Sequence, residues 1–569
     1  MALHQGNAPR KGAVFLPWWG TPGVAGGVWT GCRVSNGGMS AFTRRGFLVR
    51  LGTGITAVTA GWGPRAEGTA EGQPCSRDGL SRVDPERAGV DPAGVLDFAR
   101  GLEEAGFAGN SFMLLRGGRV VAEGWWHPYV PDAAQLTYSL TKSVVATAVG
   151  FALAEGLLRL DDRVIDVVGD LVGGTPSAHL RQLRTRHLLT MTAGHRRDPL
   201  RSLRLPRSAP STEWTRAVLE VPIDHAPGTR FAYSSGALFP LGTMLHRVTG
   251  LNLRQYLRPR LFEPLGIRVG FWEEFTDGAN VVSSGLALTT ADIAKLGQLH
   301  LRRGVWNGRR VLPRCWAERA TAKQVDTLGR SPDESVGYGY LFWRGRHNTY
   351  RAHGALDQCS VVMPDQDAVL ATTAQRHGTV LDLAWGRLLP AMDSAPSTPG
   401  RRWDEELAGL RHPVAEGAPV GRTERSGRYV FADNELGVEA ITLDIDRRRC
   451  SVVVDNERGR HSVLCGVGHW VESRSSLSAL PVLLSYSTDR GVYRPPRWNR
   501  VAGSAAWPEP DTLRMIWRFL GTPHADTLTL RFRGGTVEVE FANSVSLRGQ
   551  DTDDRPVLVG RRQNRAPSV

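Results

Sequence analysis

The pattern of residues changes near position 393, and this change constrains the fold more than any other feature. Between residues 83 and 392, helical and strand-like segments alternate. Residues 393–425 are rich in Pro, Ala, Gly, Ser and charge, which is typical of a linker. Beyond them, runs at 441–446, 451–454, 527–532 and 536–541 alternate apolar with polar residues between turn signals. A chain of 569 residues with this pattern predicts two cores, an α/β domain at 83–392 and a C-terminal all-β domain of sandwich or small-barrel type at 426–562.

The first seventy residues have the composition of a leader. Arg44 and Arg45 precede a weakly apolar run at 51–61, which is followed by small residues around Ala66. This order resembles a twin-arginine export signal. Residues 1–38 are rich in Gly and Trp without an element pattern, so we expect them to be an upstream extension, with Met39 as the start of a signal at 39–70. The protein is accordingly expected to be exported, to the extracellular space or the cell envelope.

Charge and hydropathy exclude several classes of function. The formal net charge is +14, but much of the excess lies in the leader, and the remaining basic residues are scattered among acids. We therefore expect no nucleic-acid partner. No stretch approaches eighteen apolar residues, so no integral membrane span is expected either. The oligomeric state stays open.

The cysteines and motifs argue against a metal or a cofactor. None of the six cysteines forms a C-x-x-C pair or a zinc-type Cys/His spacing, and the chain has no H-E-x-x-H, Walker A, G-x-G-x-x-G or G-x-S-x-G pattern. Cys450 and Cys465 could form a local disulfide in an exported protein, or could be small buried side chains. We expect no cofactor and no metal.

A possible nucleophile and base stand at the start of a predicted helix. Ser139 and Lys142 form an S-x-x-K pattern ahead of apolar residues at helical spacing from Val144 to Leu157. Residues three apart share a helical face, so the Lys142 amine can reach the Ser139 hydroxyl. A helix N-terminus also supplies backbone N–H donors for an oxyanion.

The choice of lysine at position 142 is informative. The chain has four lysines, and almost all its other basic residues are arginine, whose guanidinium cannot be deprotonated in a protein. A partly buried lysine can lose its proton near neutral pH and act as a base. The alternative is that S-x-x-K arises by chance and Ser139 is an ordinary N-cap.

Further segments follow in an order that resembles a known family. Residues 83–392 are similar to the serine β-lactamase and penicillin-binding-protein superfamily, in particular to its class C β-lactamase-like serine hydrolases. The blocks that carry the resemblance lie at 138–143, 156–162, 187–194, 227–235, 248–250, 262–266, 285–292 and 337–340. The resemblance implies an antiparallel sheet flanked by helices, with a helical subdomain, and Ser139 as the nucleophile with Lys142 as its base.

The family's second motif is Tyr-x-Asn, and this chain keeps only its first residue. Tyr233 is expected to relay protons, either through a depressed pKa beside Lys142 or by hydrogen bonding to Ser139. Ser235 replaces the substrate-binding Asn and shortens the polar reach. The alternative for Tyr233 is a buried structural aromatic.

The family's third motif, Lys-Thr-Gly or His-Thr-Gly, aligns best with Ala352, His353 and Gly354. In this alignment the Ala355 and Ser139 N–H groups form the oxyanion hole, and His353 and Gly354 lie beside the substrate. Shifting this alignment by one residue would place His353 at the position of the motif's Lys or His, but Gly354 would no longer match the motif's Gly. His353 could also be an ordinary strand histidine. Ala352 stands where the motif has a cationic residue, so the usual anchor for a substrate carboxylate is missing.

These features predict an exported serine hydrolase that cleaves an ester or amide through an acyl-enzyme, of esterase, D-amino peptidase or linear-amide hydrolase type. Its substrate would be a small molecule or peptide-like. The rival is a non-catalytic penicillin-binding-like protein that binds or senses cell-wall material, because fold does not guarantee function.

Overall fold

The computed structural model describes residues 77–106, 108–206, 208–329, 331–376, 378–393, 403–477, 499–544, 553 and 555–563. The expected upstream extension and export signal, residues 1–70, lie outside this part of the chain. All of the described residues belong to one unit of the structure. In the described residues, no helix combines the length and apolar character needed to cross a membrane.

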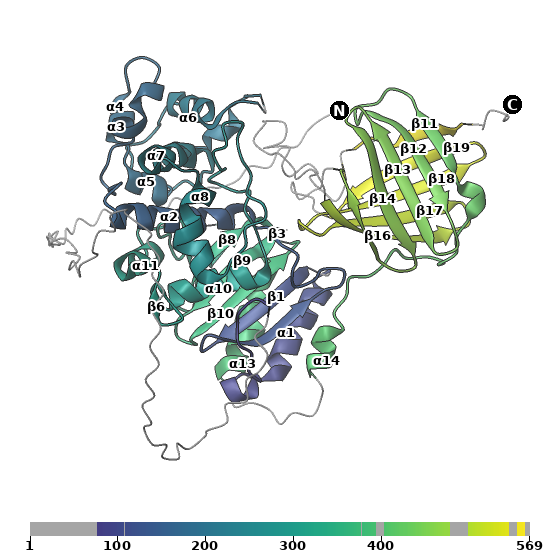
Figure 1. Cartoon of the computed structure of the whole chain (residues 1–569), viewed down its shortest axis with the longest axis horizontal. Coiled ribbons are helices and arrows are strands. Elements are labelled where there is room, and N and C mark those ends of the chain that lie inside the picture. The colour runs from purple at the N-terminus through teal and green to yellow at the C-terminus, as the bar shows by residue number, and fades with distance from the viewer. Residues whose placement is uncertain are drawn as a thin grey trace, which may run out of the picture. The chain divides into compact units, whose positions relative to one another are not determined.

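A six-stranded antiparallel sheet forms the centre of the first domain (Figure 1). Its order is β2 (Arg119–Trp125), β1 (Gly109–Arg116), β10 (Ala368–Ala374), β9 (Gln358–Met363), β8 (Tyr350–Gly354) and β7 (Trp343–Arg344). The hairpin predicted around Gly117 and Gly118 is confirmed, because both glycines adopt the positive φ that this turn requires. The strands predicted near 361–364 and 368–373 correspond to β9 and β10.

Helices cover both faces of this sheet. One face packs on α1 (Pro92–Glu104), α12 (Thr379–Leu383), the π-helical turn η8 (Ala384–Leu388) and α13 (Leu389–Asp393), around buried residues such as Phe98 and Phe112. The other packs on α2 (Thr141–Ala154) and α10 (Thr290–Leu301), around residues such as Val145 and Ile293. The sheet of 83–392 therefore has two separate apolar cores.

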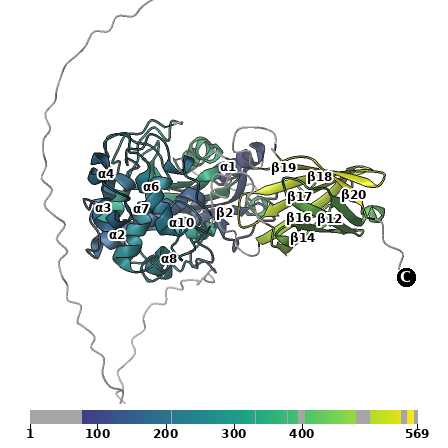
Figure 2. The ribbon, with the colours of Figure 1, turned by 90° about the horizontal axis from the view of Figure 1, so that it is seen from above.

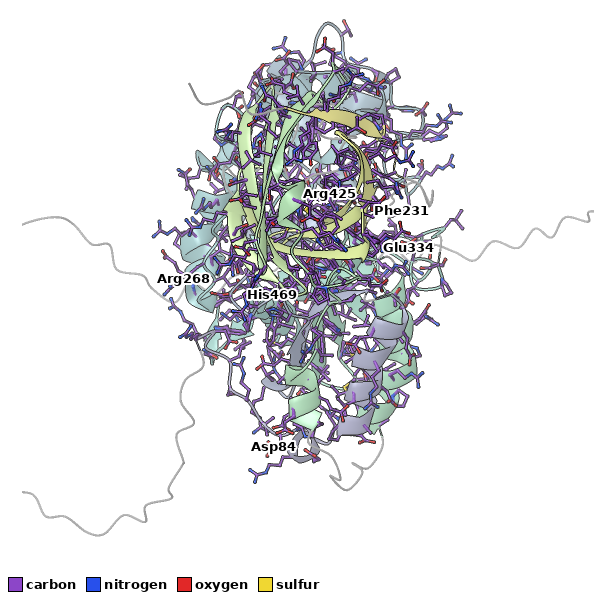
Figure 3. All side chains as sticks on the ribbon, turned by 90° about the vertical axis from the view of Figure 1, so that its right-hand side faces the viewer. Asp84, Phe231, Arg268, Glu334, Arg425 and His469 are labelled. Carbon is purple, nitrogen blue, oxygen red and sulfur yellow. The ribbon has the colours of Figure 1, made fainter. Side chains whose placement is uncertain are left out.

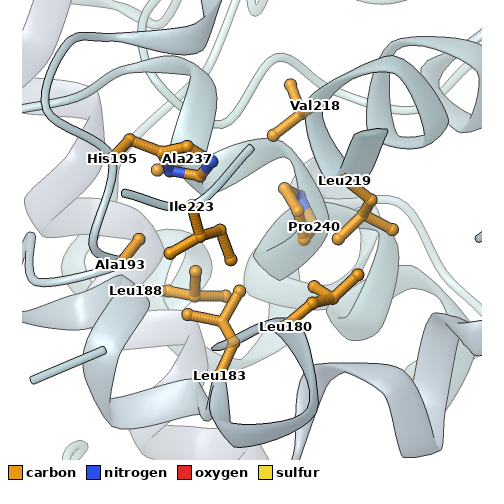
Figure 4. A pocket seen from close by; sticks show the side chains of 10 residues that line it. All are labelled: Leu180, Leu183, Leu188, Ala193, His195, Val218, Leu219, Ile223, Ala237 and Pro240. Atoms are coloured by element: carbon orange, nitrogen blue, oxygen red, sulfur yellow. The ribbon is translucent and has the colours of Figure 1, made fainter. Parts of the chain in front are cut away.

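A group of short helices forms a subdomain beyond α2. In both ribbon views α3 (Val164–Val168), α4 (Ala178–Gln182), α6 (Ser211–Glu220) and α7 (Phe239–Thr249) lie together (Figures 1 and 2). Figure 4 shows Leu180, Leu183, Ile223 and Pro240 around a small hollow among these helices. Its lining is almost wholly aliphatic and offers no nucleophile.

The remaining elements of this domain are short. They are α5 (Thr185–Leu189), α8 (Leu253–Leu257), α9 (Glu263–Leu265), α11 (Arg314–Thr321), β3 (Gln135–Leu136), β4 (Ala287–Leu288), β5 (Val305–Trp306) and β6 (Arg309–Arg310). Of the expected linker at 393–425, residues 403–425 are described and contain α14 (Trp403–Ala408).

The C-terminal domain is a closed β-barrel, one of the two predicted types. Its strands are β11 (Gly427–Phe431), β12 (Val438–Ile445), β13 (Arg449–Asn456), β14 (Gly459–Val467), β15 (Val471–Ser475), β16 (Asn499–Glu509), β17 (Thr512–Phe519), β18 (Ala525–Arg533), β19 (Thr536–Asn543) and β20 (Leu558–Arg562). Neighbours run antiparallel from β14 through β11, β20 and β17 to β15, and a parallel pairing of β14 with β16 closes the ring. Alternate apolar residues of these strands fill the interior.

Cys450 and Cys465 lie directly opposite each other on β13 and β14 inside this barrel. No disulfide joins them in the structure. The Trp517 Nε1–H donates to the Cys465 Sγ at 3.2 Å. Of the two alternatives for this pair, the structure therefore has small buried side chains.

Candidate active site

The predicted nucleophile and base meet at the start of α2. Ser139 lies in a 3₁₀ turn, η2 (Tyr138–Leu140), and Lys142 lies in the first turn of the helix that follows. The Lys142 Nζ is 2.7 Å from the Ser139 Oγ, as the three-residue spacing predicts. The same Nζ donates to the Ser283 carbonyl at 2.7 Å. These two contacts aim the amine at the Ser139 hydroxyl.

Burial makes the Lys142 ammonium lose its proton more easily, so that the neutral amine can act as a base. Its residue is 1% exposed, and desolvation lowers the pKa of Lys142 from 10.5 to about 7, while the negative charge of Asp198 partly opposes this shift. Half of the amines then lack a proton at neutral pH. A neutral amine 2.7 Å from a hydroxyl can accept its proton.

Tyr233 joins this pair but does not ionise. It stacks on Trp343, with ring centroids 5.6 Å apart, and its ring centroid is 5.2 Å from the Lys142 Nζ. Desolvation raises the pKa of Tyr233 to about 12, although a hydrogen bond with Ser139 acts in the opposite direction. The expectation of a depressed pKa at Tyr233 is therefore wrong, and its alternative, a neutral phenol hydrogen-bonded to Ser139, matches the structure. With 37% of the residue exposed, Tyr233 is not a buried structural aromatic.

Asp198 holds the loop that carries Tyr233, and sequence reasoning missed it. Its carboxylate accepts the backbone N–H of Leu200 at 3.0 Å, of Ser235 at 2.8 Å and of Gly236 at 3.0 Å. Its charge also acts on both Lys142 and Tyr233. Asp198 thus holds the Tyr233 loop and raises the pKa of Lys142. An Asp-Pro pair four residues after the 187–194 block is too common a pattern to have revealed this role.

Ser235 lies two residues beyond Tyr233 and is half-buried. Its backbone N–H donates to the Asp198 Oδ2. The structure therefore brings Ser235 to the same loop as Tyr233, where its role in binding substrate stays a prediction.

The third motif lies against the nucleophile turn. His353 and Gly354 end β8, and Ala355 begins the turn η7 (Ala355–Asp357). A Cβ atom on Gly354 would lie 2.0 Å from the Thr137 carbonyl oxygen, so no other residue fits here. This close approach brings the Ala355 backbone next to the segment that holds Ser139. The oxyanion hole of these two N–H groups stays a prediction.

His353 is held by a carboxylate behind the site. Its Nε2 is 3.3 Å from the Asp357 Oδ1, and the Asp357 Oδ2 accepts the Thr379 and Val380 N–H groups at 3.1 Å. Burial raises the pKa of Asp357, but these hydrogen bonds outweigh it and keep the pKa below its ordinary value. Its contact with Asp357 thus orients His353 near the end of β8, where its role in binding substrate stays a prediction.

Among the described residues, His353, Asp357 and Cys359 form a group whose ligand atoms lie within 4.8 Å of one another. These residues do not fit a metal ion. The Asp357 carboxylate is already occupied by three hydrogen bonds. Burial raises the pKa of the Cys359 thiol well above its ordinary value, which opposes the thiolate that a metal needs.

Two further neighbours of Tyr233 come from a distant part of the chain. Trp343 on β7 stacks on its ring, and Glu334 acts on it electrostatically. Figure 3 shows Glu334 and Phe231, two residues before Tyr233, on the same side of the protein. Trp343 and Glu334 lie more than ninety positions from Tyr233 in the chain. No local sequence pattern shows that they are close, so sequence reasoning missed both residues.

Comparisons with known proteins show which family and which proteins this chain resembles. Residues 97–389 match the family model described as Beta-lactamase. The chain is 26% identical over 238 residues to a 6-aminohexanoate-dimer hydrolase of Paenarthrobacter ureafaciens, covering 40% of this chain and 60% of that protein. It is 29% identical over 221 residues to a lovastatin esterase of Penicillium rubens, covering 34% of this chain and 55% of that protein. The match thus spans less than two thirds of these relatives.

A solved structure, the octameric penicillin-binding protein homologue from Pyrococcus abyssi, matches with a TM-score of 0.42 and 16% identity. The match covers 82% of this chain and 99% of that one.

Proposed function

The chain belongs to the beta-lactamase family, and from this premise we propose that it is an exported serine hydrolase that cleaves an ester or amide through an acyl-enzyme. The observation that carries the proposal is the 2.7 Å contact between the Lys142 Nζ and the Ser139 Oγ, at an amine whose pKa is about 7. Export is supported by the paired arginines at 44 and 45.

The proposed reaction has two steps. Neutral Lys142 takes the Ser139 proton while the Oγ attacks the substrate carbonyl, and the Ser139 and Ala355 N–H groups stabilise the oxyanion. The C–O or C–N bond then breaks, and the leaving group takes the proton that Lys142 accepted from Ser139, which leaves Lys142 neutral again. Water attacks the acyl-enzyme and gives a proton to Lys142. The bond from the acyl carbon to the Ser139 Oγ then breaks, Lys142 returns the proton to the Oγ, and the acid is released. Neutral Tyr233 supports these transfers by hydrogen bonding to the Ser139 hydroxyl.

The altered motifs favour linear esters or amides over β-lactams. Ala352 offers no positive charge to a substrate carboxylate, and Ser235 reaches less far than the usual Asn. Tyr233 packs on the buried rings of Trp343 and Tyr338 and is itself 37% exposed. A substrate with an apolar acyl or leaving group suits this exposed ring better than a charged one.

Labelling separates this proposal from the non-catalytic rival. A fluorophosphonate or penicillin probe should modify the protein at Ser139, and peptide mass spectrometry after digestion locates the adduct. A substrate screen of p-nitrophenyl esters, D-amino peptides, linear amides and β-lactams then identifies the bond cleaved. A protein that neither probe labels and that turns over no ester would be the binding or sensor protein.

The pH profile tests the assignment of the base. Turnover should rise with pH and level off with an apparent pKa of about 7, because the reactive form needs neutral Lys142. Asp198→Asn removes a charge that raises this pKa, so the rise should move to lower pH. The control is Asp224→Asn, which changes an exposed carboxylate that caps the Arg196 N–H in the same region. An unchanged midpoint in Asp198→Asn would contradict the electrostatic role of Asp198.

A further inference from the structure

We propose that His524, in the β17–β18 loop of the barrel (residues 520–524), is a positioning residue for Ser139 because it holds Tyr138. This inference rests on the proposed function. It gives the C-terminal barrel a part in the reaction.

Three hydrogen bonds join the loop to the segment that leads to the nucleophile. The Leu136 N–H on β3 donates to the Gly521 carbonyl at 2.8 Å. The Tyr129 hydroxyl donates to the Thr522 carbonyl at 3.4 Å. The Tyr138 Oη lies 2.6 Å from the His524 Nε2. The barrel loop thus holds Leu136 and Tyr138, two of the three residues that precede Ser139.

Tyr138 needs such a restraint because of its backbone. Its φ is +49°, in the left-handed region that a bulky side chain rarely adopts. Such a conformation is strained and persists where the surroundings impose it. The backbone of Tyr138 determines the direction in which the next residue, Ser139, leaves the turn. If Tyr138 relaxed toward negative φ, the Ser139 Oγ and N–H would both move.

The contact is well suited to impose this conformation. His524 has no exposed surface, and its ring meets the Tyr138 ring edge-on with centroids 6.2 Å apart. Burial lowers the pKa of His524 to about 3, so the imidazole is neutral and the pair carries no charge that water or salt would screen. The His524 Nδ1 has no hydrogen-bond partner among the described residues. A buried histidine with one of its two nitrogens unsatisfied is costly, which suggests that it is kept for the bond made by the other.

The loop itself is built to present His524 rigidly. The Phe519 N–H donates to the His524 carbonyl at 3.0 Å, and the Thr522 N–H donates to the Phe519 carbonyl at 2.9 Å. The Thr522 Oγ1 accepts the His524 N–H at 3.2 Å. These bonds close the turn between β17 and β18, so the position of His524 follows from the barrel.

The test measures the rate at which a fluorophosphonate acylates Ser139 in the full-length protein, together with kcat, KM and Tm. His524→Phe keeps an aromatic ring but loses the hydrogen bond, and should slow acylation and kcat about tenfold with little change in KM. His524→Gln places an amide near the lost Nε2 and should restore most of the rate. The control is His461→Phe, which removes another buried barrel histidine, one bonded to Ser476 and Asn456. It should lower Tm without slowing acylation.

Tyr138→Gly provides a second test, because glycine adopts positive φ without strain. In that background His524→Phe should cause little further loss of rate, since no side chain remains to be held. Two outcomes would overturn the inference while leaving the proposed function intact. One is a wild-type rate of acylation in His524→Phe. The other is that His524→Phe lowers the rate by the same factor in the wild type and in the Tyr138→Gly variant. A wild type that no probe labels would overturn both.

Discussion

Ser139→Ala should abolish hydrolysis of an activated ester, with a loss of about 10³-fold or more, while the protein stays folded. The hydroxyl that forms the acyl-enzyme is the one group that no neighbour can replace. Lys142 would remain in place, because its Nζ still donates to the Ser283 carbonyl. Loss of activity is measured by turnover of a p-nitrophenyl ester and by labelling with a fluorophosphonate. Retention of the fold is measured by the circular dichroism melting curve.

Ser143→Ala is the matched control for that variant. Ser143 lies one turn further along α2, is buried, and donates through its Oγ to the Leu341 carbonyl at 2.6 Å. Its replacement should lower the free energy of unfolding by about 1 kcal/mol and leave turnover nearly unchanged. Ester turnover in Ser139→Ala equal to that of the wild type would show that the nucleophile lies elsewhere.

The parts of this site that could be predicted from the sequence are those fixed by local geometry. Ser139 and Lys142 are three residues apart, and helical spacing alone brings their side chains together. The β1–β2 hairpin follows from Gly117 and Gly118 at the turn. The strands of the barrel follow from alternating apolar residues. In each case the residues that form the pattern are near neighbours in the chain.

The parts that could not be predicted depend on contacts between distant residues. Asp198 meets Ser235 and Gly236 across more than thirty positions, and Tyr138 meets His524 across 386. A carboxylate or a histidine has no local pattern that shows which backbone it will meet. The choice between sandwich and barrel also depended on one long-range pairing, of β14 with β16.

Tyr233 shows why even a correctly placed residue can be given the wrong ionisation. A motif specifies which side chain lies near Ser139, but the pKa depends on how much water reaches the hydroxyl. Desolvation raises the pKa of Tyr233, whereas the nearby amine had suggested a depressed one. The same desolvation lowers the pKa of Lys142. One environment thus lowers the pKa of the amine and raises that of the phenol, which supports the proposal that Lys142 is the base.

Lys142→Met should reduce turnover about 10³-fold or more, because it removes the base but keeps an unbranched side chain of similar length. Its effect on stability should depend on pH. Folded Lys142 loses its proton near pH 7, whereas in the unfolded chain it keeps the proton up to its ordinary value of 10.5. Between these values the unfolded state binds one more proton, so Lys142 makes wild-type stability rise with pH by about 1.4 kcal/mol per unit.

Lys142→Met lacks this contribution, so the free energy of unfolding of the wild type minus that of the variant should increase from pH 7 to 9.5. Denaturant titrations across this range measure the difference. Lys295→Met is the matched control, since Lys295 is 2% exposed on α10 and lies 3.8 Å from the Asp292 carboxylate. It should keep the ester turnover of the wild type. A Lys142→Met variant whose stability difference from the wild type is constant over this range would show that Lys142 does not carry the lowered pKa. A mechanism with Lys142 as base would then fail, because an amine that stays protonated at neutral pH cannot take the Ser139 proton.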